Sequence, residues 1–333
     1  SNRGRRRKSS AERYGIQMKK TGRVIGRVWD KLGIWLVFIL IFAFLSIACD
    51  NFLSSSNLIN IVRQMCVTGV VAFGAAFVVL GGEIDLSQGG IACLSGCLAA
   101  KLIVEYGINM WFAIGIVLIM GIVVGLVMGA IVTYWHVGSF ITTLGFSYVL
   151  EGIVLLLTNS QPISGLPEAF LVIGRGYLGP IPVPVIILAV TFILSAFVIK
   201  YMKFGRNVLA VGENAGAAKL CGINVAKNKI AVFAVAGLAS AFGGIVLASR
   251  LSSGQPSSGG DLSLQVLAAV YVGGTSSGSM SAILAGVLIL QLISNGLNLF
   301  GVSGYWQKVA LGIIIVLAVA LDMFRLERAT NRD

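Results

Sequence analysis

Charged residues are scarce in this chain. Asp, Glu, Lys and Arg together make up 11% of its 333 residues, whereas hydrophobic residues make up 57%. A soluble globular domain carries roughly a quarter of its residues as charged side chains. The composition therefore excludes a water-soluble fold and predicts a protein that lies in a membrane.

The side chains that build active sites are also missing. His136 is the only histidine, and the five cysteines show no metal-ligand spacing. No Gly-Lys dipeptide occurs, so the chain has no Walker A loop to hold a nucleotide phosphate. Glu83 and Asp85 stand two residues apart and would point in different directions on a helix, which does not suit a pair of catalytic acids. We expect no catalytic residues, no metal site and no cofactor.

Long apolar segments are what the chain has in abundance. A helix that crosses a bilayer needs about 20 mostly apolar residues. Ten candidates follow one another, of which the eighth is short and rich in glycine: residues 32–49, 58–80, 85–104, 111–134, 139–157, 180–199, 229–249, 262–274, 280–300 and 305–324. The sequence thus predicts an all-α, polytopic membrane protein with about ten transmembrane helices.

Positive charge is concentrated in three segments. Twenty of the 25 Lys and Arg residues fall in residues 1–31, 200–229 and 325–333. The positive-inside rule makes all three segments cytoplasmic, and six spans before the central segment with four after it agree with this. We expect a basic N-terminal arm (1–31), a membrane domain (32–324) and a C-terminal tail (325–333), with both termini cytoplasmic. The arm is expected to contact membrane lipid and not nucleic acid.

A short motif occurs twice at corresponding places. Asp85-Leu86-Ser87 follows a glycine pair and leads into the third segment, and Asp261-Leu262-Ser263 follows another pair and leads into the eighth. If segment three corresponds to segment eight, segments one to five correspond to six to ten. Because five is odd, the second copy would be inverted, as in many transporters. The sequence therefore predicts two inverted five-helix repeats.

Both motifs have the chemistry of a helix that starts inside the membrane. Glycine pairs let the chain turn, and Asp85 with Gln88 would form a capping box at the new helix. Carboxylates at such a break are costly, which makes them candidates for function. The polar residues of the two breaks have two open roles, namely capping and hinge duty or contact with a substrate or gate: Glu83, Asp85, Ser87 and Asp261.

The fifth and ninth apolar segments each carry a stripe of polar residues along one helical face. The stripes consist of Ser139, Thr143, Ser147 and Glu151 in the fifth segment, and of Gln291, Asn295 and Asn298 in the ninth. Such stripes suit a path for a neutral, hydroxyl-rich solute, but buried polar residues also bond helices to one another. The two interpretations stay open for each residue. The candidate path residues of the two stripes are Thr143, Ser147, Glu151, Gln291, Asn295 and Asn298.

The central basic segment contains a short predicted helix. Asn214 can cap it and Gly222 can end it, while an apolar side is formed by Ala217, Ala218 and Leu220. Such a helix could lie in the headgroups or dock into a groove of a partner. Sequence alone leaves both open.

Several separated motifs, taken together, resemble a known family. They are Gly82-Glu83-Ile84-Asp85-Leu86-Ser87 with Gly89; Phe140-Ile141-Thr142-Thr143-Leu144-Gly145; Gly205-Arg206, Gly212-Glu213-Asn214 and Ala217-Ala218 to Gly222-Ile223-Asn224-Val225; Gly273-Gly274-Thr275; Asn295-Gly296-Leu297-Asn298-Leu299 with Gly301-Val302; and Tyr305 with Gln307. In order and spacing the chain is similar to the membrane permease of bacterial ABC importers for monosaccharides, of the ribose, xylose and galactose type. The resemblance runs from about Leu32 to Asp322.

The resemblance implies a role and a set of partners. Two permease subunits would form the core in the bacterial inner membrane, cassette ATPases would bind beneath, and an extracytoplasmic sugar-binding protein would deliver the substrate. The ATPase would dock on the short helix, through the region of Glu213, Asn214, Ala217, Ala218, Leu220 and Gly222. The alternatives are a secondary transporter or a channel for a small polar solute, and the scarcity of paired carboxylates in the membrane disfavours an ion-coupled mechanism.

The chain departs from the family at two positions. The family usually has glycine before Ile-Asp-Leu-Ser, where this chain has Glu83, and often has valine after that serine, where this chain has Gln88. Both changes add a polar group at the first break.

Overall fold

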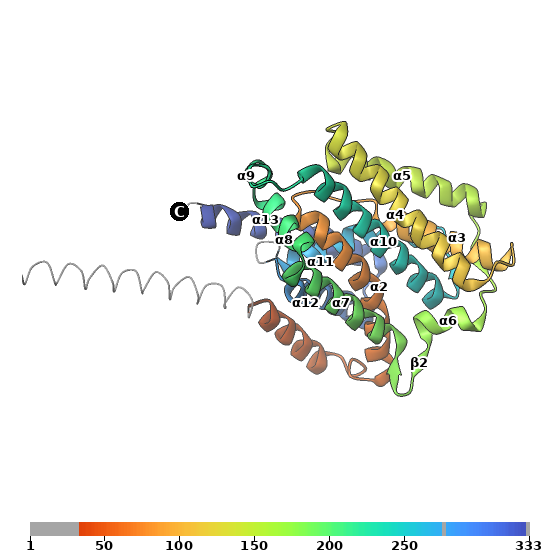
Figure 1. The fold of residues 1–333 in the computed structure, drawn as a ribbon. Coiled ribbons are helices and arrows are strands. Elements are labelled where there is room, and N and C mark those ends of the chain that lie inside the picture. The colour runs from red at the N-terminus through yellow and green to blue at the C-terminus, as the bar shows by residue number, and fades with distance from the viewer. Residues whose placement is uncertain (1–32, 275–277, 331–333) are drawn as a thin grey trace, which may run out of the picture.

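The computed structural model describes residues 33–274 and 278–330, with side chains up to residue 320. The expected basic arm, residues 1–31, lies outside the described residues. Within them the chain is almost wholly helical (Figure 1), which confirms the prediction of an all-α polytopic membrane protein.

Each of the ten apolar segments forms a helix. Among the described residues, six helices are long and apolar enough to cross a membrane: α2 (Ser55–Leu80), α4 (Met110–Tyr134), α5 (Ser139–Thr158), α7 (Val183–Tyr201), α10 (Val225–Leu251) and α12 (Met280–Leu299). The others are Gly33–Ala48, α3 (Gln88–Val104), α11 (Leu262–Gly273) and α13 (Gly304–Thr330). The short α3 and α11 are the helices that follow the two predicted breaks.

The connections contain elements that the apolar pattern did not predict. They are the helices α6 (Glu168–Arg175) and α8 (Lys203–Glu213), and the strands β1 (Ile163–Ser164), β2 (Tyr177–Leu178), β3 (Ile181–Pro182) and β4 (Ser253–Gly254). Strand β1 pairs with β4, and β2 with β3, both antiparallel. The helix predicted in the central basic segment is present as α9 (Ala215–Leu220).

Helices α2 and α10 form the centre of the bundle. Both are buried along much of their length. Helix α4 packs closely on α10 because Gly121, Gly125 and Gly129 face it, and a side chain at Gly125 would overlap the backbone of Phe233. Small residues on one face let helix backbones approach in this way. By contrast, α4, α5 and α7 present many exposed leucine, isoleucine and valine side chains, as lipid-facing helices do.

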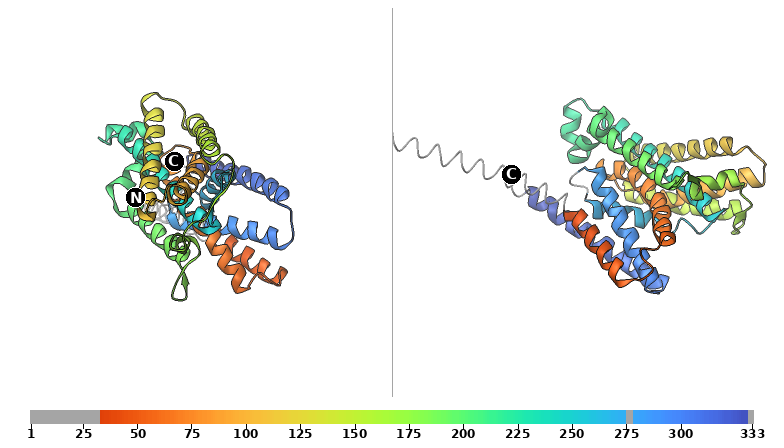
Figure 2. Two further views of the ribbon diagram at one scale, coloured as in Figure 1. Left: turned by 90° about the vertical axis from the view of Figure 1, so that its right-hand side faces the viewer. Right: turned by 90° about the horizontal axis from the view of Figure 1, so that it is seen from below.

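The order of elements repeats in the two halves. A long helix, a break and a short helix occur as α2, residues 81–87 and α3, and again as α10, residues 252–261 and α11. Helix Gly33–Ala48 packs with α12 through a small second core of Leu45, Phe52, Ile61 and Leu292. Figure 2 shows that this helix, α12 and α13 project together from one side of the bundle.

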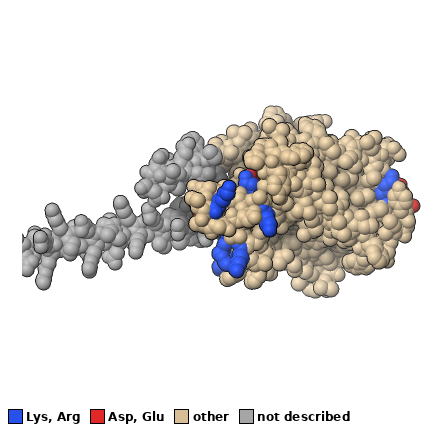
Figure 3. Space-filling view, turned by 45° about the horizontal axis from the view of Figure 1, so that its top comes forward, with Lys and Arg blue, Asp and Glu red and all other residues tan. Residues whose placement is uncertain are grey.

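The two ends of the bundle are set by α2 and α10, which run along its centre. The C-terminal end of α2 contacts α8, and the N-terminal end of α10 follows α9 directly. At the opposite end, the backbone of Arg250 in α10 contacts Gly174 in α6. These ends are called the α9 end and the α6 end. On the face drawn in Figure 3, charged side chains lie toward the two ends of the molecule and a broad surface without charge lies between them.

Candidate functional site

The segment between α2 and α3 is an irregular break whose polar groups are bonded internally. The side chains of Asp85 and Ser87 are buried, and Asp85 Oδ1 accepts hydrogen bonds from the Ser87 backbone nitrogen at 2.8 Å and from Ser87 Oγ at 2.6 Å. Helix α3 begins at Gln88, and the side chain of its cap residue, Ser87, accepts no hydrogen bond from the first turn of the helix. The predicted capping box of Asp85 and Gln88 is therefore wrong, because the carboxylate closes a turn before the helix begins.

The first half of the α5 stripe holds this break in place. Ser139 Oγ accepts a hydrogen bond from the Ile84 nitrogen at 3.2 Å, and Thr143 Oγ1 accepts one from the Leu86 nitrogen at 3.1 Å. A break inside a membrane leaves backbone groups without helical partners, and they must be satisfied within the protein. The two hydroxyls provide this, so these positions connect α5 to the break.

The breaks of the two halves meet in the middle of the bundle. Ser263, at the start of α11, donates through Oγ to the Leu86 carbonyl at 2.8 Å and accepts from the Gly89 nitrogen at 2.8 Å. The backbones of Gly89 and Gly259 lie so close that a Cβ on either would overlap the carbonyl oxygen of the other. Only glycine at both positions permits this approach.

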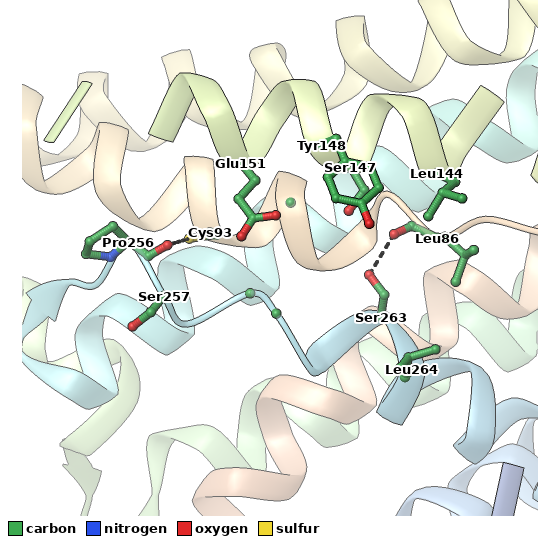
Figure 4. A pocket seen from close by; sticks show the side chains of 13 residues that line it. Leu86, Cys93, Leu144, Ser147, Tyr148, Glu151, Pro256, Ser257, Ser263 and Leu264 are labelled. Atoms are coloured by element: carbon green, nitrogen blue, oxygen red, sulfur yellow. Dashed lines mark hydrogen bonds between the residues drawn. The ribbon is translucent and has the colours of Figure 1, made fainter. Parts of the chain in front are cut away.

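A cavity of about 280 Å³ lies beside this junction. Its walls come from α3, α5, the loop before α11 and the start of α11: Leu86, Gly90, Cys93, Leu144, Ser147, Tyr148, Glu151, Pro256, Ser257, Gly259, Gly260, Ser263 and Leu264. Figure 4 shows Ser147, Tyr148 and Glu151 reaching from α5 toward the side of the cavity formed by the loop and Ser263. Apolar walls with a few polar groups are typical of sites for small ligands.

The second half of the α5 stripe therefore differs from the first. Ser147 and Glu151 line the cavity, whereas Ser139 and Thr143 bond to the break. Tyr148, Cys93 and Ser263 also line it and were not predicted. Ser263 could have been found from its place in the second Asp-Leu-Ser motif, whereas Tyr148 and Cys93 carry no sequence signal of their own.

Glu83 makes an ion pair with Lys229, near the start of α10. Their side chains are only 11% and 28% exposed, so the pair is partly shielded from solvent. Next to it, Gly82 turns with a φ of +81° and lies against Gly212 near the end of α8. The break therefore touches both elements that flank α9.

Asp261 in the second break has a different environment from Asp85. It pairs with Lys308 of α13 at 3.1 Å, and both side chains are well exposed, at 46% and 67%. It does not cap α11 with its side chain. The pair borders a further cavity of about 510 Å³ between α11, α12 and α13.

The amides predicted on α12 are bonded to neighbouring side chains. Gln291 bonds to Gln64, and Asn295 and Asn57 bond to each other at 2.7 and 3.1 Å. Asn298 accepts a hydrogen bond from Gln307 at 2.8 Å. These contacts tie α12 to α2 and α13, and Gln291 also borders a polar cavity of about 300 Å³.

The residues predicted for coupling lie together at the α9 end. Asn214 Oδ1 accepts a hydrogen bond from the Ala217 backbone nitrogen at 2.9 Å, so Asn214 caps α9 as predicted. The chain turns at Gly222, with a φ of +82°, after α9 has ended. Glu213 is the last residue of α8. Ala218 is buried, whereas Ala217 is exposed and Leu220 is 90% exposed, so one apolar side chain of α9 projects fully from the molecule.

Within residues 33–274 and 278–330, no group of three or more His, Cys, Asp or Glu side chains is arranged to hold a metal ion. The buried chemistry of the central junction is instead that of hydroxyl, amide and carboxylate groups bonded to backbone.

Comparison with known proteins identifies the architecture. The family model of the permease component of branched-chain amino acid transport systems matches residues 57–319, which is most of the chain. The chain belongs to this permease family. The matched region includes both breaks, the cavity and the α8–α9 segment, which are the features described above.

Curated relatives cover the chain at nearly full length. The ribose import permease protein RbsC of Bacillus subtilis is 40% identical over 89% of this chain and 93% of its own length. The xylose transport system permease protein XylH of Haemophilus influenzae is 33% identical over 85% of this chain and 93% of its own. The L-arabinose ABC transporter permease protein AraH of Azospirillum brasilense is 34% identical over 91% of both. No solved structure matches.

The resemblance seen in the motifs is thereby confirmed. The chain is a multi-pass permease of the ABC import type, and its named relatives are sugar permeases. A permease is a transport subunit and not an enzyme in itself.

Proposed function

We propose that this chain is the membrane subunit of an ATP-driven importer that passes a neutral monosaccharide into the cytoplasm. The observation that carries the proposal is the near full-length match to permeases named for ribose, xylose and L-arabinose. All three are uncharged sugars rich in hydroxyl groups. The central cavity offers serine hydroxyls and one carboxylate that can bond such groups, beside leucine and tyrosine side chains for the apolar ring face.

The α9 end faces the cytoplasm in this proposal. The basic residues of α8, α9 and the start of α10 lie there, including Lys203, Arg206, Lys219 and Lys227. Positive charge favours the cytoplasmic side. Both termini then lie on that side, and the α6 end faces outward, where a soluble sugar-binding protein delivers the substrate.

The motor is a separate cassette ATPase that docks on α9. Leu220 supports this, because a fully projecting leucine at the tip of a short surface helix is suited to a groove in a partner. The contacts of residues 81–87 supply a route inward from there. The break touches Gly212 in α8 and Lys229 in α10, so motion of α8 and α9 would reach the cavity lined by Leu86.

A second permease subunit covers the exposed face of α5. Glu151 is exposed in the single chain, and Tyr148 and Leu155, three and four residues away on the same helical face, are exposed as well. A carboxylate at this depth is costly against lipid. The face is therefore expected to border a water-filled path between two subunits, identical or paralogous. In the same path we place the polar residues predicted in the breaks, in α5 and in α12: Glu83, Asp85, Ser87, Thr143, Ser147, Asp261, Gln291, Asn295 and Asn298.

Uptake into liposomes tests the proposal. The purified chain, its cassette ATPase and its sugar-binding protein are reconstituted, and labelled ribose, xylose and L-arabinose are offered. ATP is supplied on the side of the membrane where the ATPase is bound. Accumulation that needs both partners and stops with a hydrolysis-deficient ATPase is expected. Accumulation against a gradient by the chain without an ATPase would show a secondary transporter instead.

The docking assignment has its own test in Leu220. Replacing Leu220 with Asp should abolish co-purification of the ATPase, because a carboxylate cannot enter an apolar groove without a large desolvation cost. Leu220→Met, which keeps an apolar side chain of similar size, is the matched control and should retain the ATPase. Equal recovery of the ATPase with both variants would reject α9 as the docking helix.

A further inference from the structure

Three arginines from distant parts of the chain meet at the α6 end. Arg63 lies in α2, Arg175 ends α6 and Arg250 lies near the end of α10. One Arg63 nitrogen donates to the Arg175 carbonyl at 2.9 Å, and Arg175 Nε donates to the Arg250 carbonyl at 2.7 Å. We call these three residues the arginine cluster.

The charge of this cluster is not neutralised within the described chain. The ion pairs found among residues 33–274 and 278–320 are Glu83–Lys229, Lys101–Glu105 and Asp261–Lys308, and none includes a cluster arginine. Arg63 Nε is buried and has no hydrogen-bond partner. Three like charges held together by backbone contacts repel one another, and an anion would relieve this repulsion.

The cluster opens onto a cavity with the lining of an anion site. The cavity measures about 410 Å³ and is lined by Asn60, Arg63, Gln64, Arg175 and Arg250. Every one of these side chains carries hydrogen-bond donors, and none carries a negative charge. Guanidinium groups bind carboxylates in a two-pronged geometry, which gives both strength and orientation.

The position of the cluster favours a protein over lipid as the source of the anion. Arg63 and Arg250 belong to α2 and α10, the central helices, whereas exposed apolar side chains of the kind that face lipid lie on outer helices such as α4 and α7. The β2–β3 hairpin lies beside the cluster. The guanidinium carbon of Arg63 lies 5.5 Å from the ring centre of Tyr177 in this hairpin. Tyr177, Leu178 and Ile181 are all exposed. Arginine and tyrosine next to exposed apolar residues are typical of protein interfaces.

We propose that the arginine cluster receives carboxylate side chains of the soluble protein that delivers the substrate to the α6 end. The inference rests on the proposed function, since it requires such a partner. It adds the chemistry of the interface: an acidic surface on the partner, at least two carboxylates within reach of the 410 Å³ cavity, and an apolar contact with the β2–β3 hairpin.

Binding measurements on the assembled transporter test this. The permease and its ATPase are placed in nanodiscs of phosphatidylcholine, and the labelled sugar-binding protein of the same system is the probe. For the unmodified transporter, affinity should fall steeply as ionic strength rises. Arg63→Gln, Arg175→Gln and Arg250→Gln should each weaken binding about ten-fold, because a carboxylate of the partner loses its cation.

Lys101→Gln is the matched control. Lys101 is also a cation near the α6 end of the bundle, but it is already paired with Glu105 and bonded to the Leu157 carbonyl. Its loss should leave the affinity for the sugar-binding protein unchanged. Retained ATPase attachment shows that each variant is folded. The salt dependence of binding is measured on the unmodified transporter, so it does not depend on how any variant folds.

Each outcome decides between distinct conclusions. Cluster variants that bind as tightly as the unmodified transporter, with affinity insensitive to salt, overturn the inference while the importer proposal stands. If phosphatidylglycerol in the nanodiscs blocks binding of the sugar-binding protein, and the cluster variants relieve this block, the cluster binds lipid headgroups. That result also overturns the inference. A transporter that binds no sugar-binding protein under any condition contradicts the proposed function itself.

Discussion

Asp85 and Asp261 hold the same position in the two Asp-Leu-Ser motifs but have different environments. Asp85 is fully buried and accepts two hydrogen bonds from Ser87. Asp261 is well exposed and pairs with an exposed lysine, Lys308. Burial decides what each carboxylate contributes, because solvent screens an exposed pair and leaves it worth little, whereas an unsatisfied buried group is costly.

This difference predicts unequal losses of stability. Asp85→Ala leaves the Ser87 amide and hydroxyl without their acceptor and should cost about 1–3 kcal/mol, whereas Asp261→Ala should cost less than about 1 kcal/mol. Thermal unfolding in detergent, followed by tryptophan fluorescence, measures both. Asp85→Asn keeps an acceptor oxygen and should lose less than Asp85→Ala. Equal shifts for the two alanine variants would contradict this assignment of roles.

Ser147 and Leu156 lie on the same helix and provide a test of the cavity. Ser147 lines the central cavity, whereas Leu156 is 82% exposed and does not. Ser147→Trp would place an indole in the cavity and should reduce ATP-driven uptake at least about ten-fold while ATPase attachment persists. Leu156→Trp adds the same side chain on α5 and should leave uptake unchanged. Similar uptake by both variants would show that the solute passes elsewhere.

At the scale of whole elements, the sequence predicts what depends on local pattern. The ten helices follow from continuous apolar runs, and the cap of α9 follows from Asn214 standing three residues before the Ala217 amide it accepts. The α12 stripe shows the limit, because its helical spacing is visible in sequence but its partners on α2 and α13 are not.

Elements and sites that depend on distant contacts were not predictable in this way. Strand β1 is two residues long and exists because it pairs with β4, about a hundred positions away in the chain. The arginine cluster joins residues 63, 175 and 250, which the sequence shows only as isolated basic residues. The start of α3 was misplaced because Asp85 bonds within the preceding turn, an arrangement that competes locally with capping.

The Glu83–Lys229 ion pair fastens the first break to α10, next to α8 and α9. If this contact carries motion from the docking segment, removing it should loosen the link between ATP hydrolysis and transport. Glu83→Gln and Lys229→Gln should each lower the number of sugar molecules imported per ATP. In a separate double-mutant cycle of stability, the two sites should show a coupling energy of about 0.5–3 kcal/mol. Uptake and phosphate release in the same liposomes give the ratio.

Two further variants complete that test. The exchange Glu83→Lys with Lys229→Glu restores opposite charges and should recover part of the lost coupling. Lys227→Gln removes an exposed cation two residues away in the same helix and should change nothing. Single variants that import normally, or an exchange that recovers none of the loss, would confine the ion pair to a local structural contact.

At the scale of the whole molecule, the two halves pack together along α10, which lies against α2, α3 and α4, and they also touch where their breaks cross. Gly89 belongs to the first half and Gly259 to the second, and each backbone occupies the space that a side chain on the other would need. Ser263 adds two hydrogen bonds across the same contact. This close crossing connects the wall of the cavity to both halves, so relative motion of the two breaks must alter this contact.

The crossing predicts that substitutions at the two glycines are not independent. Gly89→Ala and Gly259→Ala should each push the two breaks apart and lower the unfolding temperature, because the added Cβ would overlap the carbonyl oxygen of the other glycine. Once one alanine has opened the contact, the second meets less resistance, so the double variant should lose less stability than the two single losses added together. Gly145→Ala, on the open side of α5 where nothing lies within 4 Å, should be neutral or slightly stabilising. Fully additive losses from the two junction variants would mean that the glycines act separately and that the halves are held together by other contacts.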